Sequence, residues 1–288
     1  MALENPYANS LDGLDIEDPV KSFFDYCKER EAVRKKRESG APFPWSDDLI
    51  LQKGRFLNVF REDDKVSKSI IKFADPAKDN LPLLIQALFF SRWCNKQSTI
   101  DQLTLDDLHN SENLKEKLSD LKQWENHTAY PVEDSYWGEK LYNRINAATD
   151  KFYENKEELT EVILNSNFDV ITATNNVNRI FKMNNNFPIF MALIDIAWFR
   201  EDVIPITTDV PTGIGAEPYL NRLQEFLGLK NHQDVGLKMI ELQKEYWPDA
   251  KRDFYPIDIE YQSCECRKYF SYLNNTKKFE GKNLFIFK

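Results

Sequence analysis

Glycine and histidine are scarce in this chain of 288 residues, which has 9 glycines and 3 histidines. Few glycines, together with abundant Leu, Lys, Glu and Asn, favour helices joined by short loops over a strand-rich protein. His109, His127 and His232 have no cysteine near them in the sequence. A structural zinc site built from histidines and cysteines is therefore not expected.

Cysteine is also rare, and its spacing does not fit a metal or redox motif. The chain has Cys27, Cys94, Cys264 and Cys266, and a single residue separates the last two. Zinc and dithiol sites usually place two residues between neighbouring cysteines. We expect reduced, buried or half-buried thiols in a cytoplasmic protein, with no metal and no cofactor.

No apolar run is long enough to cross a membrane, and the N-terminus lacks the apolar core of a signal peptide. The most apolar segment, residues 188–200 (PIFMALIDIAWFR), has the length of a buried core helix. These absences predict a soluble, cytoplasmic protein without a membrane partner.

An excess of positive charge is missing as well, because the formal net charge is −9. Neutralising phosphates is the main source of nucleic-acid affinity, so this balance counts against a polyanionic partner. A local basic groove on an acidic body escapes that argument. The basic residues at 28–37 are the candidate for such a groove, with a solvated helix face as the alternative.

Apolar residues are plentiful, at 42%, and they recur at helical spacing. We predict an all-α protein with a flexible lead-in at residues 1–14 and a single helical domain at 15–288, in which two lobes with a central cleft are an open alternative. The predicted helices cover residues 15–39, 81–94, 103–108, 113–124, 137–152, 157–165, 170–183, 188–200, 234–246 and 261–273. A further helix is predicted to run into the segment 41–70, with Ser46 as its N-cap.

The segment 41–70 combines apolar and polar side chains at helical spacing. Leu49, Phe56 and Phe60 are predicted to form a core stripe. A second, polar row holds Gln52, Arg55, Asn58, Arg61 and Glu62, with Trp45 just before the cap. A salt-bridged surface row explains this pattern; the alternative is a binding surface with Trp45 as one wall of a cleft.

Two further segments carry candidate chemistry. In residues 210–215 (VPTGIG), Gly213 and Gly215 precede a predicted helix, so their backbone N–H groups suit phosphate, although a plain loop is the alternative. No G-x-x-x-x-G-K-[ST] motif occurs, which excludes a P-loop kinase from this sequence. In residues 259–270 (IEYQSCECRKYF), helical spacing puts Glu260, Cys264 and Lys268 on one face and Glu265 and Tyr269 on the next. This group would serve catalysis or clasp the C-terminus.

An acid also interrupts the apolar segment 188–200. Asp195 needs either a partner or a raised pKa there, because burying a lone charge is costly. It is a functional candidate, and a salt bridge to Arg92 or Arg200 is the structural alternative.

Three motifs resemble a known family. They are PWSDD-x-I-L-Q-x-x-R-F-x-N-V-x-R-E-x-D-x-V-S from Pro44, GIGAEPYLNRL from Gly213 and E-x-x-x-C-E-x-x-K-Y from Glu260. Together they are similar to phage and bacterial proteins of DNA base hypermodification, the α-glutamyl/putrescinyl-thymine pyrophosphorylases and the helical domain of 5-hydroxymethyl-deoxyuridine DNA kinases. The resemblance covers about residues 29 to 288 and implies a helical fold related to helix-hairpin-helix DNA glycosylases.

The resemblance assigns the family's motif positions to this chain, with three departures. The positions are Trp45, Asp47, Asp48, Gln52, Arg55, Phe56, Asn58, Arg61 and Asp64 in the first motif, Gly213, Gly215 and Arg222 in the second, and Glu260, Cys264, Glu265, Lys268 and Tyr269 in the third. Gly54 replaces a usual aromatic residue, Arg267 a common acid, and Glu217-Pro218 a small or basic pair. These departures suggest a separate branch with a different modified base.

The resulting hypothesis is a DNA glycosylase that cleaves the N-glycosidic bond of a flipped, hypermodified pyrimidine in phage DNA, in anti-phage defence. The predicted catalytic carboxylates are Asp48, Asp195 and Glu260, and the predicted base- or DNA-binding residues are Trp45, Gln52, Arg55, Asn58, Arg61, Gly213, Gly215, Lys268 and Tyr269. The alternatives are a transferase that joins an amine to activated 5-hydroxymethyluracil, and a non-catalytic reader of modified DNA. In each case the expected partner is double-stranded DNA carrying modified bases, without an obligate protein partner.

Overall fold

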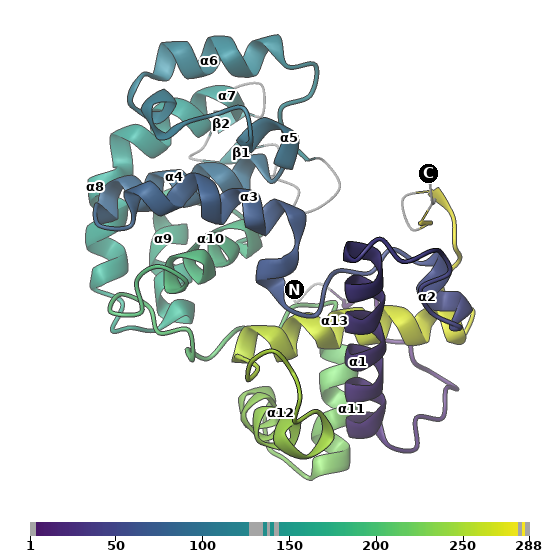
Figure 1. The fold of residues 1–288 in the computed structure, drawn as a ribbon. Helices are drawn as coiled ribbons and strands as arrows, with labels where there is room; N and C mark the ends of the chain where they lie inside the picture. Colours follow the sequence, from purple (N-terminus) through teal and green to yellow (C-terminus); the bar gives the residue numbers. More distant parts are fainter. Residues whose placement is uncertain (1–3, 127–134, 137–138, 141–143, 282–283, 286–288) are drawn as a thin grey trace. The chain divides into compact units, whose positions relative to one another are not determined.

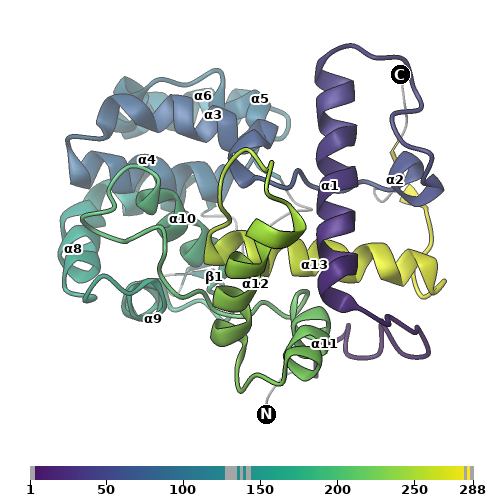
Figure 2. The ribbon, with the colours of Figure 1, turned by 60° about the horizontal axis from the view of Figure 1, so that its bottom comes forward.

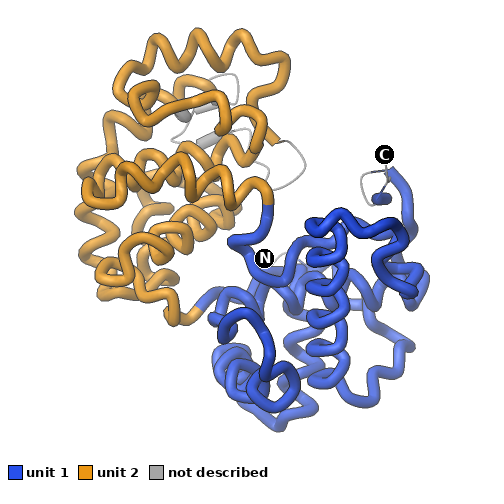
Figure 3. Tube along the Cα trace, viewed as in Figure 1, with its two compact units in different colours: residues 1–64, 210–288 blue, residues 65–209 orange. Residues whose placement is uncertain are grey.

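The protein folds into helices that form two compact units. The computed structural model describes residues 4–126, 135–136, 139–140, 144–281 and 284–285 (Figure 1). Unit 1 comprises Met1–Asp64 and Val210–Lys288, and unit 2 comprises Lys65–Asp209 (Figure 3). In the described residues, strand structure is limited to a two-residue antiparallel pair and an isolated bridge between Gly54 and Leu284. The prediction of an all-α fold is confirmed.

Unit 1 is built around its last helix, which packs against the four other helices of the same unit (Figures 1 and 2). Its helices are α1 (Pro19–Glu38), α2 (Leu49–Lys53), α11 (Glu217–Leu227), α12 (His232–Tyr246) and α13 (Pro256–Leu273), with a 3₁₀ turn at Arg61–Asp63. Aromatic side chains fill the space between them. Phe23 and Phe24 of α1 and Tyr219 of α11 are fully buried, and Tyr219 Oη donates to the Pro19 carbonyl at 2.9 Å.

The start of α1 follows from its capping residues. Asp18 is the N-cap, and its carboxylate accepts the Lys21 N–H at 2.8 Å. Pro19 suits the first turn because that position needs no N–H donor. At the other end Gly40 adopts a φ of +74°, which favours glycine and ends the helix.

Unit 2 has an apolar centre in which α4 packs against α10 and α8. Its elements are α3 (Lys65–Ala74), α4 (Leu81–Cys94), α5 (Gln97–Ile100), α6 (Ser111–Asp120), β1 (Ser135–Tyr136), β2 (Glu139–Lys140), α7 (Arg144–Asn146), α8 (Phe152–Leu164), α9 (Val170–Phe181) and α10 (Phe187–Ala197), with 3₁₀ turns at Asp75–Ala77 and Leu105–His109 and a π-helical turn at Ala147–Lys151. The predicted helix 81–94 is confirmed at both ends, and the predicted core helix at 188–200 corresponds to α10.

Residues 65–70 of the segment 41–70 belong to α3, but the continuous helix predicted in this segment is wrong from Gly54 to Asp64 and stops at Lys53. Helix α2 ends there because Gly54 is extended (φ −78°, ψ 146°) and pairs with Leu284. A Cβ on Gly54 would lie 2.4 Å from the Phe56 ring, so a side chain does not fit without rearrangement. The N-cap is Asp48 rather than Ser46, because Asp48 accepts the Ile50 N–H at 2.7 Å.

The predicted core stripe and two other expectations also need comment. Leu49 is 63% exposed, so its place in the stripe is wrong, whereas Phe60 is fully buried. The predicted helix 137–152 is wrong at Glu139–Lys140, which form β2, and is helical over 144–152; residues 137–138 and 141–143 lie outside the described part of the chain. The lead-in makes defined contacts with the rest of unit 1, because Leu11 is buried and Asn274 Nδ2 donates to the Asp12 carbonyl at 2.8 Å.

Candidate functional site

The three sequence motifs meet along helix α13 of unit 1. From the first motif, Leu57 N–H donates to Glu265 Oε2 at 3.0 Å. Lys268 Nζ donates to the carbonyl of Arg55. From the second motif, Gly213 N–H donates to Glu260 Oε1 at 3.0 Å. Segments separated by more than 200 residues are therefore joined by side chains that point from one helix.

Glu260 is the carboxyl group of this site with an unusual ionisation. Its side chain is 8% exposed, and burial raises the pKa from 4.5 to about 7, although the Gly213 N–H and the positive charge of Arg61 lower it. Arg61 is itself buried. A pKa near neutrality lets a carboxyl group both give and accept a proton under ordinary conditions.

The glycines of the second motif are needed for close approach to α13. A Cβ on Gly213 would lie 2.7 Å from Glu260 Oε1, and a Cβ on Gly215 would lie 2.7 Å from Cys264 Sγ. The Gly215 carbonyl accepts from Arg267 Nε at 3.0 Å. The turn thus presents one of its predicted N–H donors to an internal carboxylate. Burial raises the pKa of Cys264 to about 11, so this thiol stays protonated.

The polar row of the first motif forms structural contacts instead of one helical face. Asn58 Oδ1 accepts from Arg30 Nη2 at 2.7 Å, and Asn58 Nδ2 donates to the Asp63 carbonyl at 2.9 Å. Gln262 Nε2 lies 3.1 Å from the Asn58 carbonyl. The predicted cooperation of Arg55, Asn58 and Glu62 on one helical face is wrong, because residues 54–60 are not part of a helix.

Glu62 takes part in a separate ion-pair cluster. Its carboxylate accepts from Arg252 Nη2 at 2.8 Å and lies 2.8 Å from Lys251 Nζ. Burial raises the pKa of Glu62, but the hydrogen bonds from Arg252 and Lys251 outweigh it and bring the pKa to about 2. Arg252 also donates to Asp258 Oδ2 at 2.6 Å, which ties the first motif to the first turn of α13.

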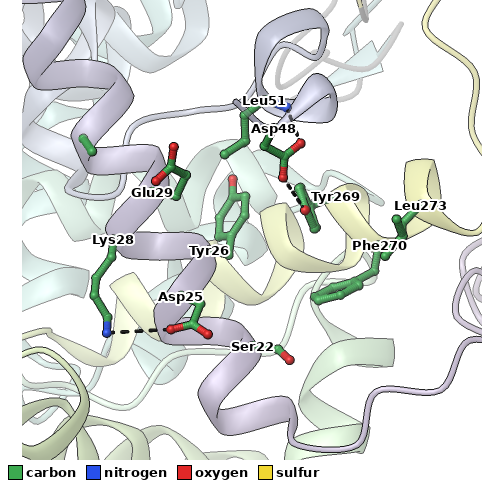
Figure 4. A pocket seen from close by; sticks show the side chains of 11 residues that line it. Ser22, Asp25, Tyr26, Lys28, Glu29, Asp48, Leu51, Tyr269, Phe270 and Leu273 are labelled. Carbon is green, nitrogen blue, oxygen red and sulfur yellow. Dashed lines mark hydrogen bonds and ion pairs between the residues drawn. The ribbon is translucent and has the colours of Figure 1, made fainter. Parts of the chain in front are cut away.

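Two predicted residues, Asp48 and Tyr269, line a pocket of about 670 Å³ in unit 1 (Figure 4). Tyr269 Oη donates to Asp48 Oδ2 at 2.5 Å, and Asp48 Oδ1 accepts the backbone N–H groups of Ile50 and Leu51. Asp25 and Glu29 of α1 line the same pocket. Asp48 is therefore engaged at both oxygens, in surroundings that are mostly acidic and aromatic.

Other predicted binding residues are placed as follows. Trp45 is 8% exposed, its Nε1 donates to the Ala41 carbonyl at 2.8 Å, and its ring contacts Phe285. The predicted open stacking wall is thus buried. Gln52 Nε2 donates to the Ser46 carbonyl at 2.8 Å. Arg55 is exposed.

Lys268 and Tyr269 hold the first motif, whereas the clasp predicted for the third motif was one of the C-terminus. Lys268 Nζ lies 3.2 Å from Glu265 Oε2, and both residues contact the first motif. Helix α13 therefore clasps residues 48–57 through these side chains.

Asp195 lies in unit 2, where it forms a buried ion pair. Arg92 Nη2 donates to Asp195 Oδ1 at 2.9 Å, and Arg92 Nε donates to the second oxygen. The structural alternative, a salt bridge to Arg92, is the one observed. Arg200 pairs with Asp202 instead, at 2.7 Å.

Sequence reasoning missed two polar residues that hold the site together, Arg252 and Gln262, and it considered Arg30 only as part of the basic residues at 28–37. Gln262 is fully buried on α13 between Ile259 and Cys266, at spacings of three and four residues. A polar residue at an apolar position of the helical spacing predicts a buried side chain with hydrogen-bond partners, so Gln262 could have been found from the sequence. The contacts of Arg252 with Glu62 and of Arg30 with Asn58 gave no comparable signal, because they span 190 and 28 residues.

The described part of the chain contains no helix long and apolar enough to cross a membrane. It also contains no group of three His, Cys, Asp or Glu residues placed to hold a metal ion.

The fold and the site define an all-α protein in which a glycine turn and a buried carboxyl group of near-neutral pKa meet on one helix. The model of the family described as 5-hmdU DNA kinase, helical domain, matches residues 17–278. The chain belongs to this family, which confirms the resemblance and links the protein to modification of 5-hydroxymethyl-deoxyuridine in DNA. No curated protein and no solved structure matches the chain.

Proposed function

We propose that this protein is an enzyme that acts on a nucleotide derived from 5-hydroxymethylpyrimidine in DNA, with Glu260 as its proton-exchanging residue. The observation that carries the proposal is the state of the three predicted carboxylates. Asp48 accepts hydrogen bonds at both oxygens, and Asp195 is paired with Arg92. Glu260, in the third motif, instead has a pKa of about 7 and accepts a hydrogen bond from the glycine turn of the second motif.

The favoured reaction is hydrolysis of the N-glycosidic bond of an extruded, hypermodified base. Enzymes that act on a base in a duplex must first bring it out of the stack. As a carboxylate, Glu260 would orient the attacking water or stabilise positive charge that develops on the sugar; as an acid, it would protonate the leaving base. Such cleavage of modified phage DNA would serve anti-phage defence.

The second candidate is a transferase that joins an amine to activated 5-hydroxymethyluracil. The kinase in the family description favours it, because phosphorylation activates a hydroxymethyl group for displacement. Glu260 would then take the proton of the incoming amine. In this reaction pyrophosphate would leave, and Arg55, Arg61 and Lys268 are the cations of the motifs that could neutralise it. They fit this role less well, because Arg61 is buried and Lys268 is paired with Glu265, which leaves Arg55 as the exposed cation of the three.

The test compares the wild-type protein with Glu260→Gln on DNA that carries 5-hydroxymethyl-deoxyuridine or its hypermodified derivatives. We expect alkali-labile abasic sites with the wild type and a loss of about 10² to 10⁴-fold in rate with Glu260→Gln, the usual contribution of acid–base catalysis. Glu225→Gln removes an exposed carboxylate of α11 in the same unit and is the matched control.

Mass spectrometry of the digested nucleosides separates the alternatives. New nucleoside adducts without abasic sites would replace the glycosylase by the transferase. Binding of modified DNA without any chemical change, unaffected by Glu260→Gln, would make the protein a reader and contradict the proposed role of Glu260.

A further inference from the structure

A second pocket of unit 1 lies at the end of α13 remote from Glu260, where the lead-in packs against the chain after the helix. It has a volume of about 410 Å³. It is lined by Asn5, Pro6, Tyr7, Asn9, Ser10, Arg267, Ser271, Thr276 and Lys277. None of these residues is among the predicted site residues, and we call this space the Arg267 pocket.

The Arg267 pocket contains two cations that form no ion pair with a carboxylate of the described residues. Arg267 is 5% exposed, and its guanidinium lies 4.1 Å from the centre of the Tyr7 ring. Its Nε donates to the Gly215 carbonyl, a neutral acceptor. Lys277 is half-buried, and its Nζ lies 5.7 Å from the centre of the Tyr272 ring. Neither cation forms an ion pair in the part of the chain that the structure describes.

The ionisation of Lys277 reflects this lack of negative charge. Its pKa is lowered, first by burial and then by the positive charges of Lys268 and Arg267, which outweigh the attraction of Glu265. Holding two cations close together in a partly buried site is unfavourable without a counter-charge. An anion between them would remove this cost.

Hydroxyl groups complete the surroundings. Ser10 Oγ is buried and has no hydrogen-bond partner in the described residues. Thr276 Oγ1 lies 3.2 Å from the Ser10 carbonyl and 3.1 Å from the Ser271 carbonyl, so it connects the lead-in to the end of α13 in the pocket wall. A buried hydroxyl without a partner is costly, and an oxyanion would accept a hydrogen bond from it.

We propose that the Arg267 pocket binds a phosphoryl group through Arg267, Lys277 and the Ser10 hydroxyl. A phosphoryl group offers several oxygens to cationic and hydroxyl donors, and such charge-assisted hydrogen bonds are the strong ones. The two sources of this chemistry are a phosphodiester of DNA and the phosphomonoester of a free nucleotide. The proposal does not depend on the reaction assigned to Glu260.

The experiment is a titration of the full chain with inorganic phosphate at constant ionic strength, in which NMR and calorimetry measure the affinity for phosphate. We expect one site, with an affinity that falls about tenfold or more in Lys277→Gln because a charge-assisted bond is lost. Lys278→Gln makes the same change one residue further along, at an exposed side chain outside the pocket, and is expected to leave the affinity within about twofold.

A second variant protects the test against misfolding. Ser10→Ala removes a hydroxyl that has no partner in the described residues, so it should not lower the unfolding temperature of the free protein while it weakens phosphate binding. Equal affinities for the wild type, Lys277→Gln and Ser10→Ala would overturn the proposal. An equal loss in Lys277→Gln and Lys278→Gln would overturn it too, since it would indicate general charge attraction.

The source of the phosphoryl group is found by repeating the titration with an unmodified duplex oligonucleotide and with a nucleoside monophosphate. If the pocket takes a DNA phosphate, Lys277→Gln weakens duplex binding and lowers the slope of log affinity against log salt by about one. If it takes a free nucleotide, only the monophosphate affinity falls. Either result supports phosphoryl binding. The absence of any Lys277-dependent change with both probes contradicts it.

Discussion

Asp195 in unit 2 and Glu260 in unit 1 are both buried carboxyl groups on helices, with exposures of 5% and 8%. Their partners differ. Arg92 meets both oxygens of Asp195, so this charge is neutralised where it is buried. Glu260 receives one backbone N–H and feels Arg61 only as a charge, and its pKa rises to about 7. A buried acid exchanges protons near neutral pH when its counter-charge is incomplete.

The two units differ in the same way around these residues. In unit 2, α4 and α10 are buried along nearly their whole lengths, and the Arg92–Asp195 pair connects them. In unit 1, α13 carries buried polar side chains that hold the loops 54–64 and 213–215. A charged pair inside an apolar packing surface serves structure, whereas polar groups on a helix that faces loops can reach a ligand.

The largest expected effect comes from breaking the neutralised pair. Asp195→Asn leaves the buried charge of Arg92 without its carboxylate, which typically costs about 3–5 kcal/mol in free energy of unfolding. Chemical denaturation measures this change. The control is Asp202→Asn, which removes the exposed partner of Arg200 and should cost less than about 1 kcal/mol. Equal costs for the two variants would contradict the structural role of Asp195.

A smaller effect is expected from filling the space beside Glu260. In Gly213→Ala the new Cβ would lie 2.7 Å from Glu260 Oε1 and displace the carboxyl group. The Gly213 hydrogen bond lowers the pKa of Glu260, so its loss should raise that pKa further. It should also lower the free energy of unfolding by about 1–3 kcal/mol. Denaturation and NMR titration of the carboxyl carbon measure both changes.

The matched control for that variant is Gly236→Ala in α12. No atom lies within 4 Å of a Cβ at this position, so alanine should stabilise the helix by about 0.5–1 kcal/mol. If both variants changed stability alike, the close contact of Gly213 with Glu260 would not be the cause.

The smallest expected effect concerns the Asp48–Tyr269 hydrogen bond. Tyr269→Phe removes the Oη donor while it keeps the ring, and it should lower the free energy of unfolding by about 1 kcal/mol. Tyr153→Phe, at an exposed ring, should change it by less than about 0.5 kcal/mol. A Tyr269→Phe variant that lost all enzymatic activity at unchanged stability would move the proposed chemistry from Glu260 to Asp48.

The sequence was sufficient to predict α4 and α10 of unit 2, because their apolar pattern arises from packing on all sides. It was also sufficient to predict that Asp195 needs either a partner or a raised pKa, since the cost of a lone buried charge does not depend on the fold, and Arg92 is the partner observed. The third motif was predicted as a helix. Its Glu260 contacts the second motif at Gly213, and its Glu265 contacts the first motif at Leu57.

The first motif could not be read in the same way, because its periodicity is helical but Gly54 interrupts it. The extended chain after Gly54 depends on the bridge to Leu284 and on the space taken by the Phe56 ring. Both are long-range or steric features that spacing does not encode. For the same reason the pairing of Arg252 with Glu62, nearly two hundred residues apart, was not predictable from the pattern.

The most direct test of the account is the pH dependence of stability in the wild type and in Glu260→Gln. The pKa of Glu260 rises from its ordinary value of 4.5 to about 7 in the folded protein. Its favourable contribution is therefore complete below pH 4.5 and is lost as the pH rises through 7, where ionisation costs roughly 3 kcal/mol.

Glutamine has no charge to gain, and its amide oxygen can still accept the Gly213 N–H. We expect the two proteins to unfold with similar free energies at pH 4, and Glu260→Gln to become the more stable by roughly 3 kcal/mol above pH 8. A difference in unfolding free energy that stayed constant from pH 4 to pH 8 would contradict the central claim that Glu260 exchanges its proton near neutrality.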